Sequence, residues 1–216
     1  YNTLLKIELH KLTKNGETIR CSEMVKRDFV EIRIHGRGGQ GAWTASRILA
    51  EAALQLNKYA QSFPEFGPER SGAPVTAYAR IGGSPIDIHC SVTKADYVIV
   101  IDPTLVDLAV HGLKKNAKII VTHSDPPEEL RKKLKVPDDV EVYSLNAVKL
   151  ALDIIGRPLA NTAMLGAFVR ATEDKIITLD SLIEALRKVL GHRLSETLIN
   201  KNIELIKRAY NEVKKG

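Results

Sequence analysis

The sequence contains few cysteines and no long hydrophobic run. Its two cysteines, Cys21 and Cys90, are too few for a disulfide framework and lack the clustered spacing of a zinc or iron–sulfur site. The longest apolar runs, such as residues 97–101, fall far short of the roughly 20 residues that a membrane-spanning helix needs. No signal-peptide pattern is present either. We therefore expect a cytoplasmic protein without membrane association, with any iron–sulfur cluster in a partner chain.

Low-complexity segments and basic clusters interleaved with aromatic residues are also missing. The 216 residues carry a net charge of +6, but Lys and Arg are spread along helix-like segments among Glu and Asp, so nucleic-acid binding is not expected. No Ser/His/Asp order and no metal-ligand spacing stands out, and the sequence predicts neither a catalytic residue nor a metal site in this chain. Because the chain begins at Tyr1 rather than Met, we expect that preceding residues were removed or left out, or that the chain is part of a longer product.

The pattern of residues divides the chain at residue 28. Leu5, Ile7 and Leu9 alternate with polar residues, and Asn15-Gly16 precedes a second short β-like run, which is typical of a hairpin. An isolated hairpin is only marginally stable, so residues 1–28 are expected to pack on the main domain or to reach another subunit. Residues 29–216 are expected to form one α/β domain.

That domain opens with a β-rich run, residues 29–35, which ends in a glycine-rich turn. A helical pattern follows directly, with apolar residues at positions 45, 48, 49, 52, 53 and 56. Strand, glycine turn and helix form the first unit of a doubly wound fold. The residues of the turn, which we expect to lie at a ligand site or a subunit interface, are His35, Gly36, Arg37, Gly38, Gly39, Gln40 and Gly41.

Further strands and helices alternate along the rest of the chain. Strands are predicted near residues 58–63, 75–81, 86–90, 97–101 and 118–122, and helices from residue 144 onward, including apolar stripes over 182–190 and 199–213. Alternation of this kind predicts a Rossmann-like, largely parallel sheet with helices on both faces. The close pair joined through Gly82-Gly83 suggests an antiparallel strand insertion.

The glycines of the turn admit three interpretations. Gly36, Gly38 and Gly41 satisfy the G-x-G-x-x-G pattern in the required strand-to-helix context, which is typical of an NAD(P)-dependent dehydrogenase. A dinucleotide site also needs an acidic residue at the end of the second strand, and the nearest acid, Glu65, lies beyond a proline. Close packing of helix on strand without a ligand is equally compatible with the glycines. Arg37 and Gln40 favour a ligand or partner, because a turn at the carboxyl end of a strand faces the crevice of α/β folds.

Four other residues carry side chains that are capable of chemistry. Asp102 follows a predicted strand and is either catalytic or, more commonly for this position, a helix cap. His35 could donate to a ligand or form a hydrogen bond that fixes the turn. Cys90 is expected in the core of a strand, and Trp43 at the helix start is expected to pack, with an interface as the alternative.

Several segments, kept in order, carry a resemblance to a known family. They are HGRGGQG at residues 35–41, Ala45-Ser46, LAEAA at 49–53, FPEFGPERSGAP at 63–74 and NTAMLGA at 161–167. Together they resemble the gamma subunit of pyruvate:ferredoxin oxidoreductase, a 2-oxoacid:ferredoxin oxidoreductase, over roughly residues 29–215. The resemblance implies a subunit, inactive alone, of an enzyme that converts pyruvate and coenzyme A to acetyl-CoA and carbon dioxide while reducing ferredoxin.

The same resemblance implies the partners and cofactors. Alpha, beta and ferredoxin-like delta subunits would hold thiamine diphosphate, Mg²⁺ and 4Fe–4S clusters, and this chain would hold none. Related gamma subunits imply two alternative substrates, a branched-chain 2-oxoacid and 2-oxoglutarate. A binding module without catalytic connection is a separate alternative to an enzyme subunit. The segment from 64 to 74 is stiffened by three prolines and is expected to be a loop at an interface or at the coenzyme A entrance. Its candidate residues are Glu65, Gly67, Pro68, Glu69, Arg70, Ser71 and Gly72.

Overall fold

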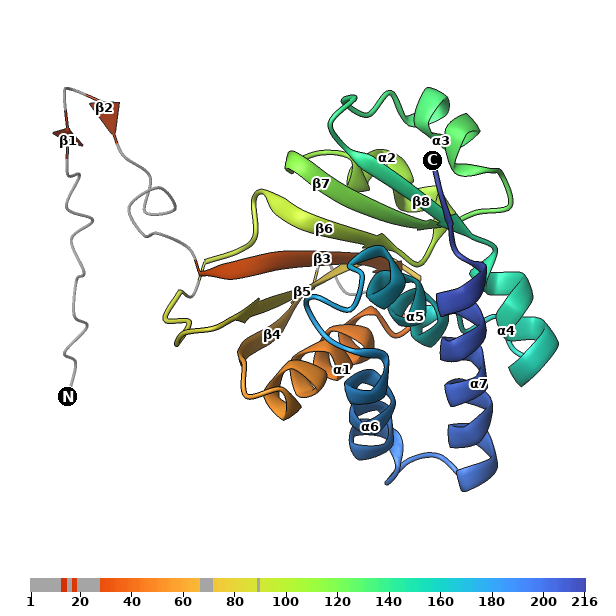
Figure 1. Cartoon of the computed structure of the whole chain (residues 1–216). Coiled ribbons are helices and arrows are strands. Elements are labelled where there is room, and N and C mark those ends of the chain that lie inside the picture. Colours follow the sequence, from red (N-terminus) through yellow and green to blue (C-terminus); the bar gives the residue numbers. More distant parts are fainter. Residues whose placement is uncertain (1–12, 15–16, 19–27, 67–71, 89) are drawn as a thin grey trace.

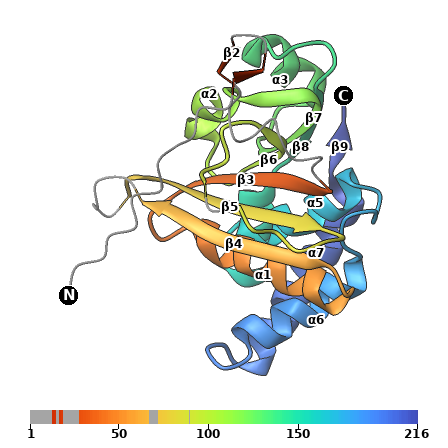
Figure 2. The same ribbon diagram turned by 90° about the vertical axis from the view of Figure 1, so that its left-hand side faces the viewer.

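A seven-stranded sheet forms the centre of the chain (Figure 1). The computed structural model describes residues 13–14, 17–18, 28–66, 72–88 and 90–216. The strands lie in the order β4-β5-β3-β6-β7-β8-β9, so β4 is an edge strand and faces the viewer in Figure 2. Their bounds are β3 (Phe29–Arg37), β4 (Tyr59–Phe66), β5 (Pro74–Gly82), β6 (Ala95–Val100), β7 (Leu113–Thr122), β8 (Glu141–Leu145) and β9 (Lys214–Lys215).

The central strands run parallel, as predicted. β3 pairs in parallel with β6, β6 with β7, and β7 with β8. β5 runs antiparallel to both β3 and β4, so the sheet has an antiparallel strand, although not the predicted pair joined through Gly82-Gly83. β9 runs antiparallel to β8. The sheet therefore extends from β3 in both directions, with β5 and β4 on one side and β6 to β9 on the other, which is the arrangement of a doubly wound sheet.

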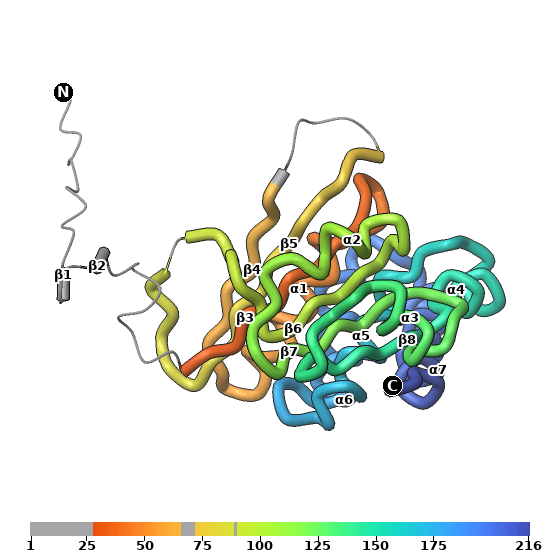
Figure 3. Tube along the Cα trace, turned by 90° about the horizontal axis from the view of Figure 1, so that it is seen from above, coloured from red at the N-terminus to blue at the C-terminus, as the bar shows by residue number. Residues whose placement is uncertain are grey.

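Helices cover both faces of the sheet, which confirms the predicted fold class. α1 (Ala42–Gln55), α5 (Asn161–Ala171) and α6 (Leu179–Leu190) lie on one face together with α7 (Glu196–Glu212) and α4 (Ala147–Ile155). The 3-10 helix η2 (Pro103–Leu105), α2 (Val106–Ala109) and α3 (Pro127–Leu134) lie on the other. In Figure 3 this second, thinner layer is nearer the viewer.

Alternation along the strands sorts side chains between the two layers. Ile32 and Ile34 of β3 are fully buried against α1, and the intervening Arg33 and His35 face the opposite layer. On the α1 side, Phe168 of α5 meets Tyr97 of β6 edge to face, with ring centroids 5.4 Å apart. Burial of this apolar layer stabilises the fold and fixes the position of the α1 and α5 amino ends.

The predicted strand at residues 86–90 is not formed. Residues 85–88 have no strand hydrogen bonding, and Cys90 is exposed rather than in the core. The carbonyls of this segment instead accept hydrogen bonds from side chains: Gln61 Nε2 donates to Ile86 at 2.6 Å, and the fully buried Arg80 donates to Ile88 at 3.1 Å and to Cys90 at 2.6 Å. A buried guanidinium needs such acceptors. The strands that pair antiparallel with β5 are β3 and β4.

The predicted loop from 64 to 74 is shorter than expected. β4 continues through Pro64 and Glu65 to Phe66, and β5 already begins at Pro74. Proline is tolerated there because β4 is an edge strand with one unpaired side. Only residues 67–73 connect the two strands.

Part of the predicted amino-terminal hairpin falls within the described residues. β1 (Thr13–Lys14) and β2 (Glu17–Thr18) pair antiparallel, on either side of Asn15-Gly16. Leu5, Ile7 and Leu9 lie outside the described residues. The division into an arm, 1–28, and a domain, 29–216, stays a prediction.

Candidate functional site

The glycine turn lies at the switch point of the sheet. It follows β3, and its neighbour on the other side is the carboxyl end of β6, where the chain reaches Asp102. The two ends are joined by the Ile101 N–H, which donates to the His35 carbonyl at 2.8 Å. Ligands of open α/β sheets bind at this point.

The backbone of the turn requires glycine at two positions. Gly39 and Gly41 have φ angles of +93° and +79°, in the left-handed region that other residues rarely adopt. A Cβ atom on Gly41 would lie 2.5 Å from Asn161 Nδ2, because α5 begins directly beside the turn. The Gly38 N–H donates to the Ala73 carbonyl at 2.9 Å, which ties the turn to the start of β5.

Asp102 connects the turn to the neighbouring strand. Its carboxylate accepts from Gln40 Nε2 at 2.7 Å and from the Thr104 N–H at 3.0 Å, and it lies 3.4 Å from Arg37 Nε. Burial alone would raise the pKa of this carboxyl, but the hydrogen bonds from Thr104 and Gln40 and the Arg37 charge lower it overall. Asp102 is thus the ionised cap of η2, and the capping interpretation is confirmed.

Arg37 and Gln40 direct their polar groups into this network. Arg37 donates to Thr104 Oγ1 at 2.7 Å and to the Gly72 carbonyl at 3.1 Å, and its own N–H donates to Gln40 Oε1 at 2.7 Å. The Arg37 side chain is 35% exposed, so one side of the guanidinium still reaches the surface. The network fixes the turn and the 72–73 connection as one rigid unit.

Beside the turn lies a cavity of about 410 Å³ between the starts of α1 and α5. Neither helix has a side-chain cap or an acidic residue in its first turn, so the positive dipole ends of both helices suit an anion. Arg157 adds a positive charge, and four leucines, from α6, α7 and two connections, form an apolar wall. The lining residues are Gly39, Gln40, Gly41, Thr44, Ile155, Arg157, Leu159, Asn161, Thr162, Leu190, Leu194, Leu198 and Asn202.

Sequence reasoning missed Arg157 and Asn202 as members of this site. Asn161 stood at the start of a segment that carried the family resemblance, but no local pattern placed it beside Gly41. Arg157 follows the end of α4 in an exposed connection, where a basic residue is ordinary. Only the packing of α5 and α7 on the sheet brings these residues together.

His35 is buried beneath the turn. The side chain is 8% exposed, and its Nε2 atom has no hydrogen-bond partner among the described residues. Burial, with a smaller effect from Arg33, lowers the pKa of His35 to about 4. The imidazole is therefore neutral at pH 7. His35 contacts the end of β6 through its backbone carbonyl, which accepts from the Ile101 N–H.

The remaining site candidates are distributed around the turn. Glu65 is exposed on β4 and accepts a hydrogen bond from Tyr78 Oη, while Gly72 accepts from Arg37. Trp43 is 46% exposed rather than packed, with the Arg47 guanidinium 5.7 Å from its ring centroid. The other predicted loop residues, Gly67, Pro68, Glu69, Arg70 and Ser71, lie outside the described residues.

The topology argues against a dinucleotide site. In a dinucleotide-binding fold, the strand after the first helix lies next to the first strand and places an acidic residue near the glycine turn. Here β5 separates β4 from β3. Glu65, the acid at the end of β4, accepts a hydrogen bond from Tyr78 of the intervening β5 and is therefore not placed at the turn.

Fold and site together define a doubly wound α/β domain with a rigid glycine turn and an anion-suited cavity beside it. The chain belongs to the pyruvate ferredoxin/flavodoxin oxidoreductase family, whose profile matches residues 31–212. It is 42% identical to pyruvate synthase subunit PorC of Methanothermobacter thermautotrophicus over 189 residues, 87% of this chain and 97% of the relative. It is 43% identical to the pyruvate/ketoisovalerate oxidoreductases common subunit gamma of Thermococcus kodakarensis over 186 residues, 85% and 97% of the two chains.

A solved structure has the same fold. The crystal structure of pyruvate oxidoreductase subunit PORC from Thermotoga maritima superposes with a TM-score of 0.76 at 38% identity, covering 88% of this chain and 99% of that one. None of the helices in the described parts of this chain is long and apolar enough to cross a bilayer. The family is that of ferredoxin oxidoreductase complexes, and the chain corresponds to their gamma subunit.

Proposed function

We propose that this chain is the gamma subunit of a pyruvate synthase, which converts pyruvate and coenzyme A to acetyl-CoA and carbon dioxide while reducing ferredoxin. The observation that carries the proposal is the 42% identity to a pyruvate synthase subunit over 97% of that relative's length. The glycine turn and the connection from β4 to β5 both fall within the matched region. Asp102 at the switch point is the cap of η2.

The proposed complex supplies the remaining parts of the reaction. Alpha, beta and delta subunits would hold thiamine diphosphate, Mg²⁺ and 4Fe–4S clusters, and ferredoxin would accept the electrons in the cytoplasm. Two distant cysteines, Cys21 and Cys90, are consistent with clusters being held elsewhere. The gamma chain would contribute surfaces that hold the other subunits and shape access to coenzyme A.

Within that role, we assign the cavity beside the glycine turn to an anionic group. Two uncapped helix starts and Arg157 favour negative charge, and the apolar leucine wall accommodates an organic body. Coenzyme A phosphates and an acidic side chain of a partner subunit both have this chemistry. The Arg37 network would keep the turn and the 72–73 connection in place while either one binds.

Affinity purification of the tagged chain from its native cell tests the proposal. We expect co-purification of three further chain types, bound thiamine diphosphate, iron–sulfur absorbance, and ferredoxin reduction that requires both pyruvate and coenzyme A. A monomer that binds NADH and recruits no partner would contradict the proposal and support a dehydrogenase instead.

A branched-chain 2-oxoacid is the second candidate substrate. It is favoured by the Thermococcus relative, whose name assigns its gamma subunit to both pyruvate and ketoisovalerate oxidoreductases. The same purification separates the two cases. One set of alpha and beta chains with pyruvate activity alone supports a dedicated subunit, and two sets with both activities support a shared one.

A further inference from the structure

A second cavity, of about 500 Å³, opens at the carboxyl ends of β7 and β8. It shares no lining residue with the cavity beside the glycine turn. Figure 1 shows β8, α4 and the end of α7 meeting in this region. The carboxyl edge of a parallel sheet is where α/β proteins bind ligands, and the proposed function makes no use of this part of it.

The charges around the cavity leave an excess of positive charge. Three acidic residues line it, and each is paired with a basic neighbour: Asp125 with Lys133, Asp153 with Lys149 at 2.7 Å, and Glu212 with Arg208 at 2.6 Å. Lys214 of β9 also lines the cavity, and within the described part of the chain it forms no ion pair. Its ammonium is therefore available to an anion.

Hydrogen-bond donors converge on the same space. Ser144 is 3% exposed and borders the cavity, yet its hydroxyl has no hydrogen-bond partner among the described residues. His123 Nδ1 accepts the Asp125 N–H at 3.0 Å, so Nε2 is the ring nitrogen left for another partner. α4, nine residues long, begins here at its Asn146 cap and carries no acidic residue in its first turn.

An apolar floor adjoins these donors. Leu145 and Leu150 are 6% and 5% exposed, and Pro126 completes the floor. The cavity is within the range of about 300–1,000 Å³ that is typical of small-molecule sites. A compact anion with an organic substituent would therefore fit better than the anion alone.

We propose that this cavity binds a phosphate group, held by Ser144, Lys214 and the first turn of α4. Phosphate suits the arrangement because its several terminal oxygens can each accept from a different donor, whereas a carboxylate has only two. The phosphate is either free or carried by a small molecule whose apolar part lies on Leu145 and Leu150. This proposal does not depend on the identity of the enzyme complex.

Isothermal titration calorimetry on the full chain distinguishes the sources, with inorganic phosphate, AMP and adenosine as probes. Tighter binding of AMP than of phosphate, with no binding of adenosine, supports a phosphorylated small molecule. Binding of phosphate and AMP with equal affinity supports a site for the free ion. Absence of binding by both phosphate-containing probes at millimolar concentration overturns the proposal.

Two variants test whether the phosphate group binds in this cavity. Ser144→Ala removes only an unpartnered hydroxyl and Lys214→Gln an exposed charge, so both should fold, and circular dichroism verifies this. Each should weaken the affinity about tenfold, the effect of one charge-assisted hydrogen bond. Lys94→Gln, at an exposed lysine that lines neither cavity, is the matched control and should leave the affinity unchanged. Unaltered binding in both test variants, or loss of binding in the control, overturns the assignment.

Discussion

At the level of single residues, the candidate site depends on two glycines with left-handed backbones and on one ionised carboxylate. Gly41 combines a left-handed backbone with contact to Asn161, whereas Gly39 has a left-handed backbone with open space where a Cβ atom would stand. Asp102 gathers donors from the turn and from η2 on one carboxylate. These residues set the shape of the turn before any ligand or partner is considered.

The two glycines give a matched pair of substitutions. Gly41→Ala should lower the free energy of unfolding by about 3 kcal/mol, because backbone strain and a clash with Asn161 add together. Gly39→Ala should lower it by only about 1 kcal/mol, since strain acts there without a clash. Urea denaturation measures both, and equal losses would show that the contact with Asn161 does not constrain the turn.

His35 predicts a pH dependence of stability. Its folded pKa of about 4 lies below the ordinary 6.5, so between these values the unfolded chain binds more protons and stability falls as the pH falls. The loss should approach about 3 kcal/mol at pH 4, from 1.36 kcal/mol per pKa unit. Unfolding of the wild type and of His35→Gln between pH 4 and 7.5 isolates this contribution. Parallel stability curves for the two proteins would contradict it.

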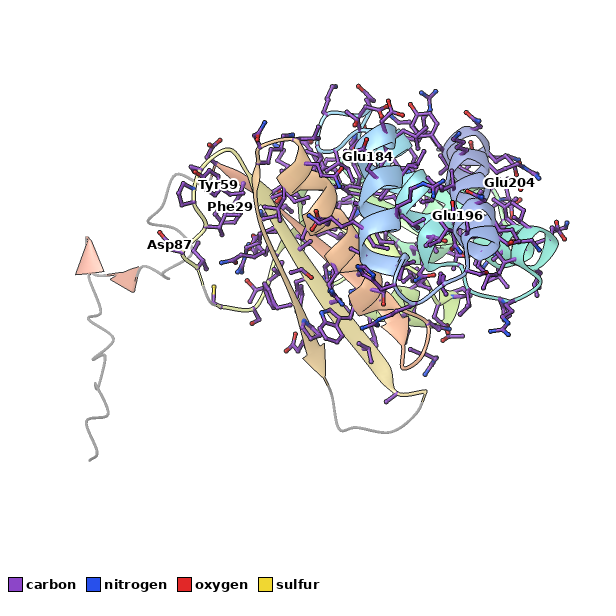
Figure 4. The ribbon with its side chains drawn as sticks, turned by 90° about the horizontal axis from the view of Figure 1, so that it is seen from below. Phe29, Tyr59, Asp87, Glu184, Glu196 and Glu204 are labelled. Carbon is purple, nitrogen blue, oxygen red and sulfur yellow. The ribbon has the colours of Figure 1, made fainter. Side chains whose placement is uncertain are left out.

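At the level of elements, the connection between β4 and β5 is joined to the glycine turn at its carboxyl end. Arg37 donates to the Gly72 carbonyl and the Gly38 N–H donates to the Ala73 carbonyl. Figure 4 shows Tyr59 at the start of β4, Phe29 at the start of β3 and Glu204 on α7. Glu204 therefore offers a control position on a different element of the chain.

Glu69→Ala and Arg70→Ala test that contact. In an assembled complex their charge-assisted hydrogen bonds would be desolvated, and removal of one partner costs about 2–5 kcal/mol of binding free energy. We expect weaker assembly or slower pyruvate-dependent ferredoxin reduction, with an almost unchanged melting temperature of the isolated chain. Glu204→Ala, an exposed acid on α7, is the control. Normal assembly and turnover in both variants would reduce the segment to a simple connection.

At the level of the whole molecule, the chain is a scaffold with two separate cavities on the carboxyl edge of one sheet. Its relatives are oxidoreductase subunits, and Asp102 at its own switch point is the cap of η2.

The purified single chain should carry neither thiamine diphosphate nor an iron–sulfur cluster. Its two cysteines cannot supply the four thiolates that a typical cluster needs. The measurement is the visible absorbance of the chain after anaerobic purification, together with mass analysis of extracted cofactors. Cluster-like absorbance in the single chain would refute this prediction, whereas the assembled complex should show it.

Elements with local signals could be predicted from the amino-acid sequence. Alternation and the glycine pattern predicted β3, its turn and α1, and apolar stripes predicted α6 and α7, because these signals depend on neighbours within a few residues. Segments in the order of a known family predicted the gamma-type fold and its family. The capping role of Asp102 could also be predicted from the sequence, because capping is a local interaction.

Which distant groups meet depends on the packing of the folded chain. β5 lies between β3 and β4, and the buried Arg80 donates to the Ile88 and Cys90 carbonyls of the segment that was predicted as a strand. Asn161 reaches Gly41 only because α5 packs across the sheet, and Ser144 and Lys214 meet only because β9 returns to β8. Such pairings depend on the summed burial and hydrogen bonding of the whole chain, and no local spacing records them.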